Sequence, residues 1–240
     1  MENKIKELNK EGKTDMEISI LLNIPYFKVG RVRNKLNLPV NSKHQNVYMT
    51  DIQEEAFIGT LLGDSTLVFK TKLSKYPSFQ FSHTEKQKEY FNYKVNIFKN
   101  LMSKSKIHLL KSKFTSEEGV LVYGSYSYNI PSLLKYKKIF YPINKKVIPL
   151  EFIKNKFSEL SLALLIYDDG CKDNLNYKLS TYCFERENVL EFSKFLYEKF
   201  NIKSTVHKNS VLYFSRQSTK IITKILQKYP VKNMQYKIIV

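Results

Sequence analysis

The stretch FIGTLLGDS at residues 57–65 has a counterpart in the second half of the chain, LALLIYDDG at residues 162–170. Each stretch is a run of about ten almost wholly apolar residues, too short to span a bilayer, that ends in a carboxylate beside a small residue. A strand-like segment follows each run. The pattern predicts two buried helices, each of which delivers an acidic side chain to a defined point.

Small residues in the two runs predict how these helices pack. Gly59 and Gly63 are four residues apart and therefore share one helix face, where the absence of side chains lets another helix approach to backbone contact. Ala163 is the small residue near the start of the second run. We expect these three residues at a helix interface, which would bring Asp64 and Asp169 together at its end.

The two stretches resemble the paired motifs of LAGLIDADG homing endonucleases, in the form that carries both copies in one polypeptide. The sixth motif position, often Asp in that family, is Leu62 and Tyr167 here, and the closing glycine of the first copy is Ser65. The eighth position, which carries the family's metal-binding acid, is Asp in both copies. The resemblance runs from about residue 50 to residue 240.

The resemblance implies an α+β fold of two pseudo-symmetric αββαββα repeats, residues 51–148 and 149–240. Their two four-stranded antiparallel sheets would form a saddle whose concave face lies in a DNA major groove. We predict strands at residues 66–70, 78–83, 107–114, 120–128, 177–183, 204–208 and 211–216. Further helices are expected at residues 85–101, 131–140, 185–200 and 219–229, with Ser158 as the cap of the second motif helix.

Alternation in the strands indicates which side chains would face DNA. Residues 78–83 place Phe79 and Phe81 on one face and Gln80 and Ser82 on the other. We expect the polar face to contact DNA. Lys178 and Arg216 are the corresponding candidates in the second repeat.

The resemblance implies that Asp64 and Asp169 bind Mg²⁺, with Mn²⁺ as a substitute, and it adds the adjacent Gly63 and Asp168 to the metal site. A carboxylate at a helix C-terminus faces the negative end of the helix dipole, so two such acids need a cation. Mg²⁺ binds carboxylates together with phosphate oxygens and water. Asp168 points about 100° away from Asp169 on a helix, which favours a supporting or solvent position. The alternative is that each acid only ends its helix in solvent.

The family also places polar or basic side chains near each metal to orient water. One such position falls on His83, where Gln is more usual, and near Tyr182 in the second repeat. Another, commonly Lys, falls near Arg216 and Gln217. His83 and Gln217 are therefore catalytic candidates, and the alternative for His83 is an exposed surface histidine.

The amino-acid composition indicates which kinds of partner the protein can bind. Forty Lys and Arg residues against 22 Asp and Glu give a formal net charge of +18, which attracts polyanions, although AT-rich coding would also inflate lysine. The two cysteines, Cys171 and Cys183, predict neither a disulfide framework nor a zinc site. Without a secretory signal or a membrane-spanning stretch, we expect an intracellular protein of a bacterial or phage-infected cytoplasm or an organelle matrix.

Residues 1–40 read as a separate helix-turn-helix unit, followed by a linker at residues 41–50. Helices are predicted at residues 2–10, at 14–22 with a Thr14/Glu17 capping box, and from Pro25 to about residue 39. The expected core is Ile18, Leu21, Leu22, Val29, Val32 and Leu36. The expected DNA-contacting residues, largely on the outer surface of the third helix, are Lys28, Arg31, Arg33 and Lys35. The alternative is a basic, solvated helical hairpin.

These features predict a monomeric, Mg²⁺-dependent endonuclease that cuts both strands of a long, imperfectly palindromic DNA target. Two other functions stay open. One is a DNA-binding transcription regulator that does not cleave. The other is an intron maturase of the same fold that binds RNA.

Overall fold

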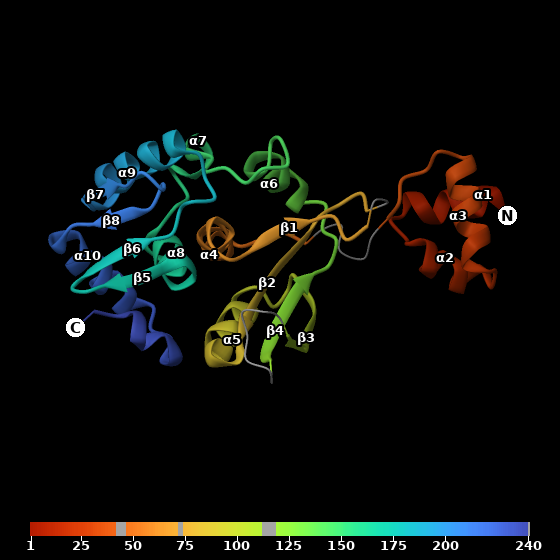
Figure 1. Cartoon of the computed structure of the whole chain (residues 1–240). Helices are drawn as coiled ribbons and strands as arrows, with labels where there is room; N and C mark the ends of the chain where they lie inside the picture. Colours follow the sequence, from red (N-terminus) through yellow and green to blue (C-terminus); the bar gives the residue numbers. More distant parts are fainter. Residues whose placement is uncertain (42–46, 72–73, 112–118, 240) are drawn as a thin grey trace. The chain divides into compact units, whose positions relative to one another are not determined.

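The computed structural model describes residues 1–41, 47–71, 74–111 and 119–239 (Figure 1). The chain divides into two compact units, Met1–Val47 and Tyr48–Val240. Half of the predicted linker, residues 42–46, lies outside the described residues. Each unit has a hydrophobic core of its own.

Three helices make up the first unit: α1 (Glu2–Lys10), α2 (Asp15–Leu22) and α3 (Tyr26–Lys35). The predicted capping box is present at α2, where the side chains of Thr14 and Glu17 each accept a bond from the other residue's backbone N–H. Asn23 adopts a left-handed conformation with φ of 50° and ends α2. Pro25 is the N-cap of α3 and not its first residue, and the helix ends earlier than predicted.

The core of the first unit is centred on residues from all three helices. Its members are Ile5, Ile18 and Val29, with Leu8, Leu22, Ile24 and Val32 packed against them. The prediction for Leu21 was wrong, because its side chain is 59% exposed. Leu36 is half-buried at the end of α3 and does not belong to this cluster. Helix α1 contributes Ile5 and Leu8 to this core.

The second unit begins with one complete repeat. Its elements are α4 (Asp51–Leu62), β1 (Thr66–Val68), β2 (Ser78–Thr84), the 3-10 turn η1 (Glu85–Gln87), α5 (Lys88–Ile97), β3 (Met102–Leu110), β4 (Val120–Ser127) and α6 (Leu133–Phe140). The strands form an antiparallel sheet in the order β1-β2-β4-β3. The predicted end of a strand at residues 112–114 lies outside the described residues.

The second repeat follows the same plan. Its elements are α7 (Leu150–Ile153), α8 (Glu159–Asp169), β5 (Gly170–Asp173), β6 (Asn176–Leu179), α9 (Arg186–Phe200), β7 (Ser204–Val206), β8 (Leu212–Phe214), α10 (Arg216–Lys228) and η2 (Lys232–Lys237). The strand order β5-β6-β8-β7 matches that of the first sheet. The predicted α+β duplication with two antiparallel sheets is confirmed. Figure 1 shows α4 and α8 side by side between the sheets.

Two predicted strands of the second repeat are shorter in the structure. The strand expected at residues 177–183 ends at Leu179, where the sheet pairing between β6 and β8 stops. The strand expected at residues 211–216 ends at Phe214 because the hydroxyl of Ser215 caps α10 by accepting a bond from the backbone N–H of Ser218. Arg216 and Gln217 therefore lie in the first turn of a helix.

Aromatic packing fixes the orientation of the first sheet. The ring of Phe57 on α4 lies 4.8 Å from that of Phe79 and 5.0 Å from that of Tyr136, measured between centroids. The alternation of β2 therefore turns Phe79 toward α4 and leaves Gln80 and Ser82 on the opposite face. The strand thus has an apolar face against the helices and a polar face directed away from them.

The two motif helices approach each other to backbone contact. A Cβ atom at Gly59 would lie only 2.2 Å from the carbonyl oxygen of Ser161 on α8. The hydroxyl of Ser161 donates to the carbonyl oxygen of Glu55 on α4 at 2.7 Å. Ala163, which also belongs to α8, is fully buried. This close approach brings the C-terminal ends of both helices to one place.

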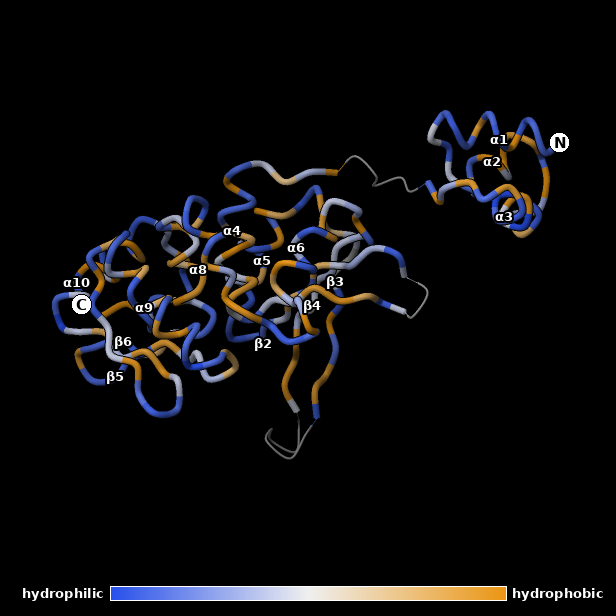
Figure 2. Tube along the Cα trace, turned by 90° about the horizontal axis from the view of Figure 1, so that it is seen from above, coloured by the Kyte–Doolittle hydropathy of each residue, from blue (hydrophilic) through white to orange (hydrophobic). Residues whose placement is uncertain are grey.

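Hydrophobic side chains are exposed on the β3–β4 hairpin. Figure 2 shows hydrophobic residues on both strands close to the hairpin tip, and Ile107, Leu109 and Leu121 are 61%, 51% and 37% exposed.

No helix in the described parts of the chain combines the length and the apolar character needed to cross a membrane.

Candidate active site at the paired helix ends

Two carboxylates lie where the motif helices end. Gly63 is the C-cap of α4 and Asp64 follows it, whereas Asp169 is the last residue of α8. Desolvation, followed by repulsion from Asp64 and Asp168, raises the pKa of Asp169 to about 7. Asp64 reaches solvent, yet desolvation by nearby protein and repulsion from Asp168 also raise its pKa. The two acids therefore lie close enough to repel each other.

In the described part of the chain, neither of these two carboxylates is neutralised by direct contact with a protein group. Within the described residues, no donor forms a hydrogen bond or an ion pair with the side-chain oxygens of Asp64 or Asp169. Carboxylates at the negative end of a helix that also repel each other are stabilised by a bound cation. The site thus has free oxygen ligands of the kind that Mg²⁺ and Mn²⁺ bind.

Two lysines that the sequence did not identify point at the ends of the same helices. The Nζ atom of Lys146 donates to the carbonyl oxygen of Gly63 at 2.8 Å. The Nζ atom of Lys237 donates to the carbonyl oxygen of Asp168 at 3.1 Å and also to that of Tyr167. Desolvation lowers the pKa of both lysines, while the acids oppose this shift. Each motif helix therefore ends against an ammonium group.

A sequence signal for these lysines exists in their position within each repeat. Lys146 follows α6 and Lys237 lies at the end of η2, so each comes after the last long helix of its repeat. The equivalence of Lys146 and Lys237 can be recognised only when the sequences of the two repeats are aligned over their whole length.

Asp168 is neither a solvent group nor a free metal ligand. Its side chain has no exposed surface. Oδ1 accepts bonds from the hydroxyl of Tyr90 at 2.7 Å and from Nζ of Lys94 at 3.0 Å. Oδ2 accepts bonds from the hydroxyl of Thr60 at 2.8 Å and the backbone N–H of Asp64 at 3.3 Å. Of the two positions expected for Asp168, the solvent position was wrong and the supporting position agrees with these contacts. The metal role is a poor fit because protein donors already occupy both oxygens.

His83 is buried and not an exposed surface residue. It continues the inward face of β2, and its Nε2 atom lies 3.1 Å from Nζ of Lys94 while Nδ1 lies 3.2 Å from the side-chain oxygen of Gln87. Desolvation and the nearby Lys94 ammonium lower the pKa of His83 to about 4. The imidazole is therefore neutral at pH 7, with Nδ1–H donating to Gln87 and Nε2 accepting from Lys94.

Ligand atoms of Asp64, His83 and Asp168 all lie within 4.8 Å of one another, which is a spacing that a metal ion can bridge. His83 and Asp168, however, already accept hydrogen bonds with the atoms that would bind the metal. The pair that fits a divalent cation better is Asp64 with Asp169. The carbonyl oxygen of Gly63 accepts from Lys146 and retains a second lone pair.

The polar face of the first sheet opens beside Asp64. A cavity of about 270 Å³ is lined by Asp64 together with Gln80, Ser82, Lys106 and His108. Gln80 and Ser82 lie on the polar face of β2, as the alternation predicted, and the structure adds that this face adjoins Asp64. Lys106 and His108 on β3 were not identified from the sequence.

The remaining candidates of the second repeat lie away from these contacts. Lys178 is half-buried on β6, with its ammonium group 6.0 Å from the centre of the Tyr213 ring. Arg216 and Gln217 are exposed in the first turn of α10. No described interaction joins Gln217 to Asp64 or Asp169, so its catalytic role stays a prediction without structural support.

The basic residues of the first unit separate into two groups. Lys28 and Arg31 are exposed, and the Arg31 guanidinium lies 5.5 Å from the centre of the Phe27 ring. Arg33 instead bonds the carboxylate of Asp15 with N–O distances of 3.0 and 2.8 Å, and Lys35 pairs with Glu2 at 2.8 Å. The expectation that Arg33 lies on the outer surface was wrong, because its side chain is only 13% exposed in this ion pair.

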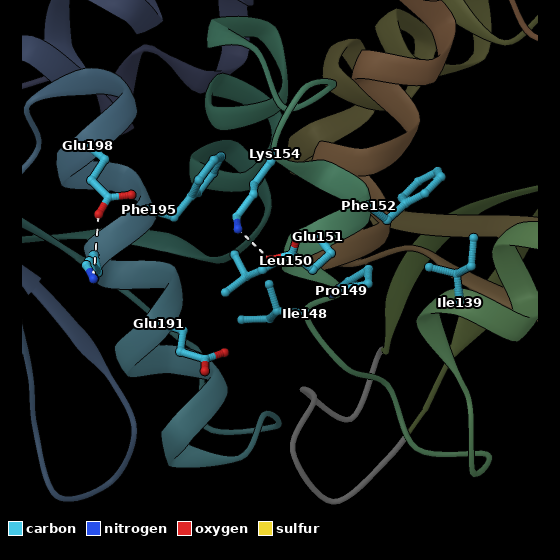
Figure 3. A pocket seen from close by; sticks show the side chains of 11 residues that line it. Ile139, Ile148, Pro149, Leu150, Glu151, Phe152, Lys154, Glu191, Phe195 and Glu198 are labelled. Carbon is cyan, nitrogen blue, oxygen red and sulfur yellow. Dashed lines mark hydrogen bonds and ion pairs between the residues drawn. The ribbon is translucent and has the colours of Figure 1, made fainter.

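A second cavity, of about 650 Å³, lies between the segment that contains α7 and helix α9 (Figure 3). Figure 3 shows Glu191 and Glu198 on α9, across from Glu151 and Lys154. Lys154 pairs with Glu151, and Lys194 pairs with Glu198 at 3.8 Å. Three carboxylates on its walls make this cavity unsuited to phosphate groups, and neither Asp64 nor Asp169 lines it.

Comparison with known proteins agrees with this architecture. A sequence profile of the LAGLIDADG DNA endonuclease family matches residues 54–222. The homing endonuclease I-WcaI, solved bound to its DNA recognition sequence, superposes with a TM-score of 0.71 at 24% identity, over 86% of this chain and 96% of that one. This similarity shows a shared fold.

Curated relatives carry the names of maturases and endonucleases. Cytochrome b mRNA maturase bI2 of Saccharomyces cerevisiae is 39% identical over 101 residues, which are 40% of this chain and only 24% of that protein. The maturase bI2 of Debaryomyces hansenii is 27% identical over 89% of this chain and 85% of its own length. Probable intron-encoded endonuclease 1 of Wickerhamomyces canadensis is 26% identical over 82% and 88% of the two chains. Because the family profile covers more than half of the sequence, the chain belongs to the LAGLIDADG DNA endonuclease family.

Proposed function

We propose that the protein is a site-specific endonuclease that hydrolyses both strands of a DNA duplex at a site built from Asp64 and Asp169. The observation that supports this most directly is the pairing of two carboxylates, free of protein donors, at the adjacent ends of α4 and α8. Their raised pKa values reflect an acidic centre that a divalent cation would stabilise.

Mg²⁺ or Mn²⁺ suits this oxygen-rich site, and the ion would polarise a phosphate oxygen and make a bound water more acidic. Asp64 and Asp169 would hold the ion. Lys146 and Lys237 place two ammonium groups beside them, where they balance the charge of the acids and of an incoming phosphate. We assign no step to Gln217.

Recognition of DNA would use the polar faces of the two sheets, with Gln80, Ser82 and Lys178 among the contacting residues. The similarity to I-WcaI, which was solved with its DNA recognition sequence, supports this role. Two similar but not identical repeats in one chain favour a monomer and an imperfectly palindromic target. Lys28 and Arg31 of the first unit would extend the footprint to one side, and the site of action would be inside the cell or an organelle.

A second candidate function is an intron maturase that binds RNA. The names of the Saccharomyces and Debaryomyces relatives favour it, and the net charge of +18 suits RNA as well as DNA. A regulator that binds DNA without cutting is less well supported, because both acids and both lysines are present at the helix ends.

The decisive experiment uses a DNA duplex that carries the junction formed when the intervening sequence encoding this protein is absent. We expect cutting of both strands in Mg²⁺, no cutting in EDTA, and loss of cutting in Asp64→Asn and Asp169→Asn while both variants still retard the duplex in a gel. Arg216→Ala is the binding control, since it changes a candidate DNA contact outside the acid pair. Full cutting by both Asn variants would contradict the assignment, and tight binding to the intron RNA without DNA cutting would favour the maturase.

A further inference from the structure

The carboxylate of Asp168 crosses from the second repeat into the first. Asp168 belongs to α8, yet the side chains that bond it, those of Thr60, Tyr90 and Lys94, all belong to α4 and α5. The side chains of Lys94 and Asp168 have no exposed surface. The contact is a buried ion pair with satisfied hydrogen bonds, and it joins the two halves of the second unit.

This arrangement occurs once among the residues that the structure describes. The position that faces Asp168 across the helix pair is Gly63, where a Cβ atom would lie 2.6 Å from the Cβ atom of Asp168. Helix α9, which corresponds in order to α5, buries only apolar residues, namely Val189, Phe192, Phe195 and Leu196. The carboxylate of Asp168 therefore reaches into the first repeat, and no equivalent carboxylate of the described part of the first repeat reaches into the second.

The two metal-binding candidates are consequently held in different ways. The backbone N–H of Asp64 donates to Oδ2 of Asp168, and the hydroxyls of Thr60 and Ser65 on either side of Asp64 lie 2.7 Å apart. Asp169 is held by its own helix, and its carbonyl oxygen accepts from the N–H of Ser180 at 3.1 Å. Among the described residues, Asp64 is the one acid of the pair whose backbone N–H is held by a charged side chain from the other repeat.

Resting on the nuclease function proposed above, we infer that Asp168 and Lys94 are positioning residues for the Asp64 half of the site alone. Oδ2 of Asp168 fixes the turn that presents Asp64, and Lys94 keeps the charge of Asp168 balanced inside the protein. Their loss displaces Asp64 more than Asp169. Cleavage of the DNA strand served by Asp64 then slows more than cleavage of the other strand, and the enzyme becomes a nicking enzyme.

The variants must distinguish a displacement of Asp64 in a folded protein from a failure of the protein to fold. Asp168→Asn keeps the size of the side chain but leaves the buried Lys94 without its counter-charge, which can prevent folding. The double variant Lys94→Met, Asp168→Asn removes both charges together and keeps the volume of both side chains. Ser193→Ala is a matched control, because it breaks a contact between Ser193 and Ser204, 2.8 Å apart, within the second repeat.

The experiment measures single-turnover cleavage of a duplex whose two strands carry different fluorophores, at a temperature where circular dichroism shows each variant folded. We expect the ratio of the two strand rates to change by about tenfold or more relative to the parent in Asp168→Asn and in the double variant. Ser193→Ala should leave that ratio within about twofold.

Equal slowing of both strands, or unchanged rates on both, would overturn the positioning role, because a general loss of stability does not distinguish between strands. A folded double variant gives this answer even when the single variant does not fold. A parent protein that cuts neither strand would instead overturn the proposed nuclease function, and the strand asymmetry with it.

Discussion

Asp168 fills the space that Gly63 leaves open across the pair of motif helices, since a Cβ atom at residue 63 would lie 2.6 Å from the Cβ atom of Asp168. The two helices can therefore end side by side with their acids adjacent. This closeness has an electrostatic cost, because three carboxylates and two helix C-termini meet at one point. Lys94, Lys146 and Lys237 offset part of that negative charge.

Replacing Gly59 by alanine should destabilise the second unit by about 2–4 kcal/mol. The added methyl group would meet the backbone of Ser161 at 2.2 Å, and backbone cannot move aside as a flexible side chain can. Urea unfolding followed by circular dichroism measures the effect. Gly124→Ala is the control, because its nearest neighbours would lie 3.9 Å away or farther, and it should cost less than about 1 kcal/mol. Equal stabilities of the two variants would contradict the close helix contact.

Asp169→Asn should stabilise the metal-free protein at pH 8 but not at pH 4. The pKa of Asp169 is raised to about 7 in the folded state, against about 3.9 in an unfolded chain. The folded state therefore holds the proton more tightly, and this residue reduces stability progressively as pH rises from about 4 to about 7. The Asp169→Asn variant has no carboxylate at this position and avoids that destabilisation, so we expect its free energy of unfolding at pH 8 to exceed that of the parent by about 1–2 kcal/mol.

This gain is measured by urea unfolding in EDTA at both pH values, with Glu191→Gln as an exposed control. The same difference between the Asp169→Asn variant and the parent at pH 4 and pH 8 would show that the pKa of Asp169 is not raised. Addition of Mg²⁺ should stabilise the parent and leave the variant nearly unchanged, because the ion binds the folded site.

Arg33→Ala and Arg31→Ala should separate folding of the first unit from DNA binding. Arg33 is held by Asp15, and breaking this largely buried pair should cost about 2 kcal/mol of stability. Arg31 is exposed beside Phe27, so its loss should change stability by less than about 0.5 kcal/mol. If Arg31 contacts a guanine, its loss should weaken DNA binding by about 1–3 kcal/mol. Thermal melting and a gel-shift titration measure the two effects, and a stable Arg33→Ala protein would argue against the Asp15 pair.

Lys146→Met and Lys237→Met should each reduce cleavage by about 100-fold and weaken DNA binding only slightly. Methionine keeps the length of the side chain and removes the ammonium group that lies against the carbonyl oxygen of Gly63 or Asp168. Lys145→Met is the matched control, because the neighbouring Lys145 is exposed and pairs with Glu185. Single-turnover cleavage rates at saturating protein give the comparison. An unchanged rate in both variants would show that the lysines only cap their helices.

Much of the fold was predictable because its signals are local. The apolar runs at residues 57–65 and 162–170, the cap Ser158, and the alternation in β2 each involve residues that are neighbours in the sequence. Element ends were less predictable. The helix α10 begins at Arg216 because Ser215 caps it, although the same residues could continue a strand.

By itself, the sequence determined the duplicated α+β plan, the contact between motif helices through Gly59, and the two acids that end those helices. Periodicity, small residues and caps act within a few residues of one another, so they can be read along the chain. Only the tertiary structure decided that His83 and Asp168 are buried, that Arg33 is paired within its unit, and that Lys94, Lys146 and Lys237 surround the acids. Those outcomes depend on contacts between residues far apart in the sequence, and it is the packing of the two repeats that brings them together.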